Sequence, residues 1–117
     1  GLKVIGTASS EQKLTKIAEL GADFAINYTE DDWTDEVLQA TDGKGVNWII
    51  EMVGGDIVGK NLKVLAKHGT MWIYGSASNQ DFRVSVLSLM HKNHKICGYW
   101  LMNESIENRI AFTKELL

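Results

Sequence analysis

The sequence contains no proline and only one cysteine among its 117 residues. A single cysteine, Cys97, excludes an internal disulfide and the multiple-cysteine pattern of structural zinc sites. A lone thiol is typical of a reducing compartment, so we expect the protein in the cytoplasm, with the mitochondrial matrix as the alternative. The absence of proline says little about function.

Long apolar runs and an excess of positive charge are also missing. No stretch is apolar over the length that crosses a bilayer, so we expect no membrane span. The formal net charge is −3, and the basic residues do not gather into one patch of the sequence. This balance gives no reason to expect nucleic acid or an anionic membrane surface as a partner.

Short apolar runs of strand type alternate with helical patterns along the chain. Strands are predicted over residues 3–7, 24–26, 46–53, 71–74 and 94–101. Helical faces lie between them, at Leu14 and Ile17, at Trp33 and Val37, at Val58, Leu62 and Leu65, within 82–90 and from Glu104 onward. This alternation predicts an α/β fold, a Rossmann-type doubly wound parallel sheet with right-handed crossovers.

Several local predictions accompany this fold. Ser9 and Gln12 have the spacing of a helix capping box, and Gly21 that of a C′ glycine. The near-continuous apolar run over 46–53 predicts a strand covered on both faces. Within it, Glu51 needs a partner and is expected near the strand end, at least partly solvated, with no role as a general base.

Two histidines and the single cysteine could suggest a functional site, but their sequence context does not support one. His91 and His94 are spaced i, i+3, but no third metal ligand accompanies them, so we expect surface histidines and no metal site. Cys97 is expected to be a small strand residue, because nothing nearby in sequence would lower its pKa. We assign no catalytic residue.

The residues that follow the first predicted strand indicate an anion site. Ligands of an open parallel sheet bind at the carboxyl ends of its strands. Where an NADH-binding domain tends to carry an acid for the ribose 2′-hydroxyl, this sequence has Ser9, Ser10 and, one turn into the helix, Lys13. Hydroxyls, a helix N-terminus and a cation favour a 2′-phosphate, and therefore NADPH. Alternatively, Ser9 only caps the helix and Lys13 is a solvated residue.

The ends of the next strands supply the other candidate cofactor contacts. Tyr28 could stack near the adenine or donate to the 2′-phosphate, or be an ordinary rim aromatic. Gly54 and Gly55, which follow Val53 at the end of the third strand, would let a cofactor approach the backbone, or form a plain turn. Tyr74, Gly75 and Ser76 end the fourth strand and would lie near the nicotinamide. Backbone groups of Tyr74 and Ser76 could hold its carboxamide, or the segment could form only a turn.

These segments, in this order, resemble the cofactor domain of the medium-chain dehydrogenase/reductase superfamily. The resemblance rests on Val4–Ser10 with Lys13, Leu20–Asp23, Ile26–Tyr28, Gly45-Val46, Val53–Gly55 and Gly69–Gly75. It is nearest to the zinc-independent quinone oxidoreductases, the zeta-crystallin-like NADPH:quinone reductases. Gly98–Leu101 also resembles a short run in the mitochondrial 2-enoyl thioester reductases, a sister branch.

The resemblance implies roles for particular residues and a larger parent protein. Ser9, Lys13 and Tyr28 match the family's contacts to the 2′-phosphate and adenosine, and Val53, Gly54 and Tyr74–Ser76 match its nicotinamide-side contacts. Residues 1–117 would then be a partial NADP-binding domain, lacking the first strand, its glycine-rich turn and the catalytic domain. Strand 46–53 would lose a neighbour, and the piece alone would be unstable, or incomplete as a folding unit, and inactive.

The expected function is the cofactor-binding part of an NADPH-dependent oxidoreductase that reduces a small acceptor, a quinone or an α,β-unsaturated carbonyl compound. A homodimer through the strand at 94–101 is expected, since an open edge strand tends to pair. A 2-enoyl thioester reductase and a non-catalytic NADPH-binding or dimerising module are the alternatives. A methyltransferase is disfavoured by Ser9, Ser10 and Lys13.

Overall fold

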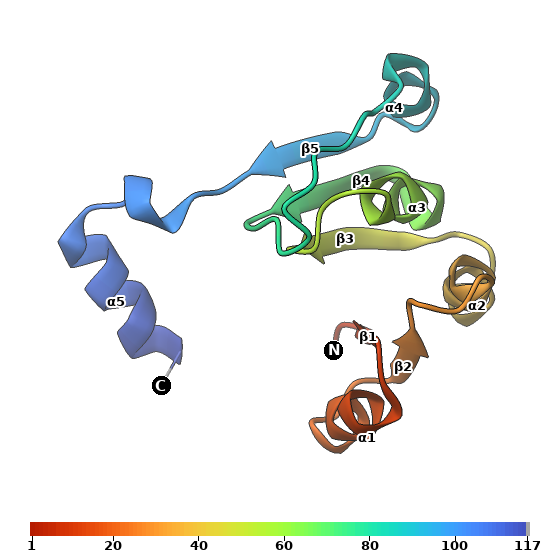
Figure 1. Cartoon of the computed structure of the whole chain (residues 1–117), viewed down its shortest axis with the longest axis horizontal. Helices are drawn as coiled ribbons and strands as arrows, with labels where there is room; N and C mark the ends of the chain where they lie inside the picture. The colour runs from red at the N-terminus through yellow and green to blue at the C-terminus, as the bar shows by residue number, and fades with distance from the viewer. Residues whose placement is uncertain (117) are drawn as a thin grey trace.

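The computed structural model describes residues 1–116, in which five strands alternate with helices (Figure 1). In chain order the elements are β1 (Ile5–Ala8), α1 (Glu11–Glu19), β2 (Phe24–Asn27), α2 (Trp33–Ala40), β3 (Val46–Glu51), α3 (Ile57–Val64), β4 (Leu65–Ile73), α4 (Val86–Lys92), β5 (Lys95–Gly98), the 3₁₀ turn η1 (Leu101–Asn103) and α5 (Ile106–Leu116). The predicted α/β fold is confirmed. None of the described helices is both long and apolar enough to cross a membrane.

The strands form two separate parallel sheets. One sheet pairs β1 with β2, and the other has the order β3-β4-β5. In the described residues β3 pairs on one side only, with β4. The missing neighbour of this strand stays a prediction. Figure 1 shows the two sheets as distinct bodies, with α2 on the path between them.

Two apolar clusters form the core and join the two sheets. The first contains Ile26, Trp33, Val37 and Val64, and so unites β2, α2 and the end of α3. The second contains Val58, Leu62, Leu65 and Met71 and lies between α3 and β4. Because α3 contributes to both clusters, this helix connects the β1–β2 sheet to the β3–β5 sheet.

The helix predicted to run through Leu65 is shorter than expected, and that prediction is wrong. α3 ends at Val64, and Leu65 is already extended, with φ −73° and ψ 128°. Leu65 is buried in the same cluster as Val58 and Leu62. Its helical spacing in the sequence therefore predicted its burial but not its extended backbone. The two residues that follow Ala66, Lys67 and His68, also belong to β4.

β3 is covered on one face, so the prediction of a strand buried on both faces is also wrong. Ile49 packs on the cluster beneath α3, whereas Trp48 is 61% exposed and Ile50 is 67% exposed. Ile50 lies in register with Trp72 of β4, which is 43% exposed, so the open face continues across the sheet. None of the described helices covers this face, and its apolar residues therefore remain at the surface.

Three smaller expectations also change. The N-cap of α1 is Ser10, and no side-chain capping bond forms there, so the capping box of Ser9 and Gln12 is absent. His94 is half-buried rather than at the surface, because its Nε2 lies 3.1 Å from the carbonyl oxygen of Leu65. The last strand spans only Lys95–Gly98, since η1 already occupies the end of the predicted range 94–101.

Candidate functional site

The carboxyl ends of β1 and β2 bring the first group of predicted cofactor residues together. Ala8 pairs with Asn27, and the backbone N–H of Tyr28 donates to the carbonyl oxygen of Ala8 at 3.1 Å. Ser9 and Ser10 follow Ala8 directly, so they lie at the same edge as Tyr28. The ring of Tyr28 is partly buried against the first core cluster.

Ser10 and Lys13 have polar groups that the described residues do not occupy. The Ser10 hydroxyl makes no capping bond, although Ser10 is the N-cap of α1. Lys13 is exposed in the first turn of this helix, and its N–H donates to the Ser10 carbonyl oxygen at 3.0 Å. The only side-chain ion pair of the described residues joins Lys16 to Glu19 at 3.2 Å, so the Lys13 ammonium has no acidic partner there.

The chemistry of these groups fits a phosphoryl ligand. Two hydroxyls, an ammonium and the N-terminus of α1 all favour negative charge. Glu11 in the same first turn opposes it, although the residue is exposed and therefore screened by solvent. The donor set is otherwise one that can accept the 2′-phosphate of NADPH.

The second group of predicted residues lies at the carboxyl ends of β3 and β4, where two loops are bonded together. The N–H of Tyr74 donates to the Glu51 carbonyl oxygen at 3.0 Å, and that of Ser78 donates to Val53 at 2.8 Å. Gly54 is buried and has φ 77°, a left-handed conformation that disfavours a side chain. A Cβ there would also lie 2.7 Å from the Ser76 Oγ. Gly54 is therefore required by loop packing.

Glu51 holds this loop, in a way that sequence reasoning did not foresee. The expectation of a partly solvated carboxylate is wrong, because Glu51 is only 4% exposed. Its Oε1 accepts the N–H groups of Val53 at 2.5 Å and Gly54 at 2.9 Å, and its Oε2 accepts the side-chain amide of Asn61. The general need of a buried acid for partners was the available signal.

A depression of about 410 Å³ opens at the carboxyl edge of the β3–β5 sheet. Tyr74, Gly75 and Ser76 line it, and Ile73 and Gly98 complete the strand ends. It is also lined by three residues not assigned from the sequence, Tyr99, Trp100 and Asn103. Tyr99 and Trp100 lay within the strand predicted over 94–101, which hid their position beyond the end of β5.

The predicted site residues thus form two groups, one at the carboxyl edge of each sheet. Ser9, Ser10, Lys13 and Tyr28 belong to the β1–β2 edge, and Val53, Gly54, Tyr74, Gly75 and Ser76 belong to the β3–β5 edge. Cofactor contact by each residue stays a prediction. Within residues 1–116, no group of three or more His, Cys, Asp or Glu side chains could hold a metal.

The family model described as "Zinc-binding dehydrogenase" matches residues 1–115. The chain belongs to this family, within the medium-chain dehydrogenase/reductase superfamily. The predicted resemblance is therefore confirmed, whereas independence from zinc stays a prediction. Members of this family that resemble the chain include a quinone oxidoreductase-like protein 2 homolog of Nematostella vectensis, 36% identical over 97% of this chain and 34% of that protein. A quinone oxidoreductase of Salmonella typhimurium is 37% identical over 99% of this chain and 34% of its own length.

Solved structures of this family show the same arrangement of elements. The crystal structure of a 2-haloacrylate reductase matches 88% of this chain and 33% of its own chain, with a TM-score of 0.81 and 32% identity. A quinone oxidoreductase from Pseudomonas syringae matches 83% of this chain with a TM-score of 0.75 and 31% identity. The chain spans about a third of the length of these relatives. The family is one of nucleotide-binding domains, which supports binding of NAD or NADP by this part.

Proposed function

We propose that this chain is the cofactor-binding part of an NADPH-dependent oxidoreductase that reduces quinones or α,β-unsaturated carbonyl compounds. The observation that carries the choice of NADPH is the end of β1, where Ser9, Ser10 and Lys13 replace the acid that favours NADH. The relatives named as quinone oxidoreductases and 2-haloacrylate reductase support the acceptor class.

In this proposal each of the two sheet edges binds a different part of the cofactor. The ammonium of Lys13 and the hydroxyls of Ser9 and Ser10 bind the 2′-phosphate, while Tyr28 lies beside the adenosine. The loops after β3 and β4 orient the nicotinamide, and the depression lined by Tyr74 and Trp100 faces the acceptor. NADPH, when bound, supplies the hydride, and these residues bind, orient and exclude water.

The cofactor choice is tested by replacing Lys13 in the full-length protein that contains this chain. K13A is expected to weaken NADPH about tenfold or more, since a charge-assisted hydrogen bond is worth about 1.5–3 kcal/mol, and to leave NADH unchanged. K16A is the matched control on the same helix. Fluorescence titration gives both dissociation constants. Equal losses for the two cofactors would refute the role of Lys13.

The acceptor class is tested by turnover. We expect the full-length protein to oxidise NADPH in the presence of quinones or enones. Faster turnover with 2-enoyl thioesters would favour the alternative of a 2-enoyl thioester reductase, for which Tyr99 and Trp100 at the depression are the supporting observation. Tight NADPH binding without turnover would instead favour a non-catalytic binding module.

We further propose a cytoplasmic or mitochondrial-matrix homodimer. β5 is the outer strand of its sheet, and among the described residues its second edge has no partner. An unpaired strand edge favours addition of another strand, and the same strand of a second copy would satisfy it. Native mass measurement of the full-length protein tests this, with a monomer as the contrary result.

A further inference from the structure

We propose that Glu51 is a positioning residue whose buried carboxylate ties the loop Val53–Gly55 to α3, so that the nicotinamide side of the site is formed before the cofactor arrives. This inference rests on the proposed function, which assigns that loop to the nicotinamide. It adds a residue that contacts no cofactor atom and acts through the loop that does.

The bonding of Glu51 supports this role. One carboxylate accepts three N–H groups, two from consecutive residues of the loop and one from Asn61 on the next helix. Glu51 and Asn61 are 4% and 6% exposed, and the described residues give Glu51 no ion-pair partner. The charge is thus compensated only by these donors, and charge-assisted bonds of this kind are the stronger ones.

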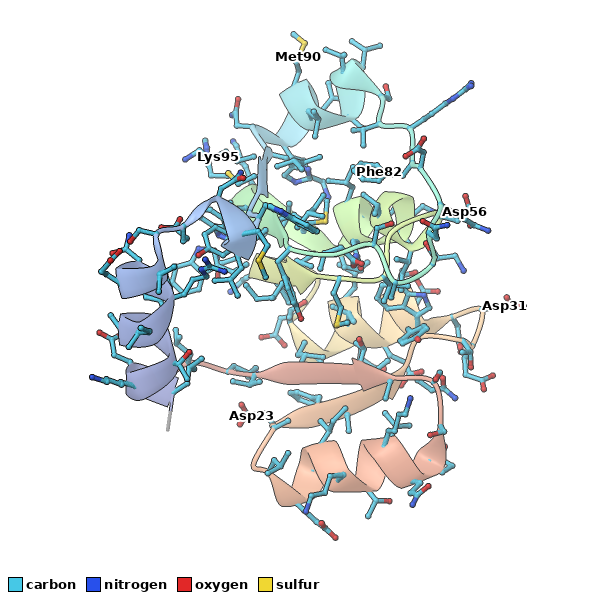
Figure 2. The ribbon with its side chains drawn as sticks, turned by 60° about the vertical axis from the view of Figure 1, so that its left-hand side comes forward. Asp23, Asp31, Asp56, Phe82, Met90 and Lys95 are labelled. Carbon is cyan, nitrogen blue, oxygen red and sulfur yellow. The ribbon has the colours of Figure 1, made fainter. Side chains whose placement is uncertain are left out.

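The loop is also held from its other side. The carbonyl oxygens of Met52 and Val53 accept N–H groups from Ala77 and Ser78, both at 2.8 Å. Since Glu51 already occupies the N–H groups of Val53 and Gly54, the cofactor cannot order this loop through them. Figure 2 labels Asp56, which follows this loop at the start of α3. We call the set of bonds from Glu51 to Val53, Gly54 and Asn61 the Glu51 clamp. This clamp orders the loop in the free protein, so less conformational entropy is lost when a ligand binds.

The test compares four forms of the full-length protein with the wild type: E51Q, N61D, the exchange E51Q/N61D, and D56N as the control. D56N removes an acid beside the loop that is exposed and makes no side-chain cap bond. Each form is titrated with NADPH and with adenosine 2′,5′-bisphosphate, which lacks the nicotinamide, and its melting temperature is measured. In the exchange, the new amide at position 51 can donate to the new carboxylate at position 61.

We expect E51Q to weaken NADPH about tenfold and N61D to weaken it at least as much, because the latter opposes two carboxylates. Adenosine 2′,5′-bisphosphate should bind all forms equally, and D56N should match the wild type. The exchange should recover most of the NADPH affinity that N61D loses, since it restores a donor–acceptor pair between positions 51 and 61.

A lower melting temperature with unchanged NADPH affinity in E51Q would overturn the inference, because it is the result of a merely structural role. Equal loss of both ligands would overturn it too. If E51Q does not fold, the exchange decides: recovery of folding and NADPH binding supports the clamp, and no recovery overturns it. A wild type that binds neither ligand refutes the proposed function itself, before any variant is compared.

Discussion

The two sheet edges are built differently, although both are carboxyl ends of parallel strands. At the β1–β2 edge the candidate groups are exposed side chains, Ser9 and Lys13, that make no side-chain bond to the described residues. At the β3–β5 edge the candidates are backbone segments tied together by Glu51 and by bonds between loops. The first edge can vary in ligand choice at little cost in stability, whereas at the second edge stability and binding are coupled.

The largest effect that tests this contrast is expected for G54A, with G21A as the matched control. Both glycines have positive φ, 77° for Gly54 and 95° for Gly21, so an alanine at either costs about 1–2 kcal/mol of strain. Only at Gly54 would the new Cβ meet a neighbour, the Ser76 Oγ at 2.7 Å, whereas at Gly21 nothing lies within 4 Å. Overpacking adds about 1–3 kcal/mol.

We therefore expect G54A to lower the free energy of unfolding by about 2–5 kcal/mol and to weaken NADPH, while G21A loses only the strain term and binds normally. Denaturant unfolding and cofactor titration of the full-length protein measure both quantities. Equal destabilisation by the two variants would show that loop packing at Gly54 contributes nothing.

A smaller effect is expected for S10A at the other edge. A serine that caps a helix contributes about 1 kcal/mol, but the Ser10 hydroxyl makes no capping bond. We expect the free energy of unfolding to change by less than about 0.5 kcal/mol, and NADPH affinity to fall about tenfold with NADH affinity unchanged. A loss of stability without a change in cofactor affinity would make Ser10 a cap and remove it from the site.

The smallest expected effect is the pH dependence that His94 contributes. Burial lowers the pKa of His94 below 6.5, and its Nδ1 is a buried atom without a hydrogen-bond partner in the described residues. The unfolded chain therefore binds a proton more readily than the folded one, so stability falls as pH drops below 6.5 through the folded pKa. H94Q should therefore lose less stability than the wild type between about pH 7.5 and 5. Parallel pH profiles for wild type and H94Q would contradict this.

The sequence was informative where local chemistry decides the structure. The alternation of apolar runs predicted the parallel α/β fold, and the polar residues after Ala8 indicated the carboxyl end of β1. The sequence patterns gave wrong predictions where tertiary contacts decide the structure. Leu65 fits the apolar face of α3 but begins β4, and Trp48 and Ile50 are apolar yet exposed. Those outcomes depend on which elements pack against each face, which periodicity does not encode.

The site shows the same division. Tyr74 ends the predicted strand 71–74, and Gly75 and Ser76 follow it. The rule that ligands bind at strand ends chose these residues, and they line the depression, whereas their contact with a cofactor stays a prediction. The clamp at Glu51 was not predictable, because its partner Asn61 lies ten residues away on a different element and its polar side chain carries no periodic signal. Tyr99 and Trp100 were missed as lining residues because the depression forms only when β5 pairs with β4.

The central claim is that exposed charge and hydroxyls at the end of β1 select the 2′-phosphate, and the salt dependence of cofactor affinity tests it most directly. Dissociation constants of NADPH and NADH are measured for the full-length protein at low and high salt. We predict NADPH to bind at least about tenfold tighter at low salt and this advantage to shrink as salt screens the exposed charges. Equal affinity for the two cofactors, or tighter binding of NADH, would contradict the claim.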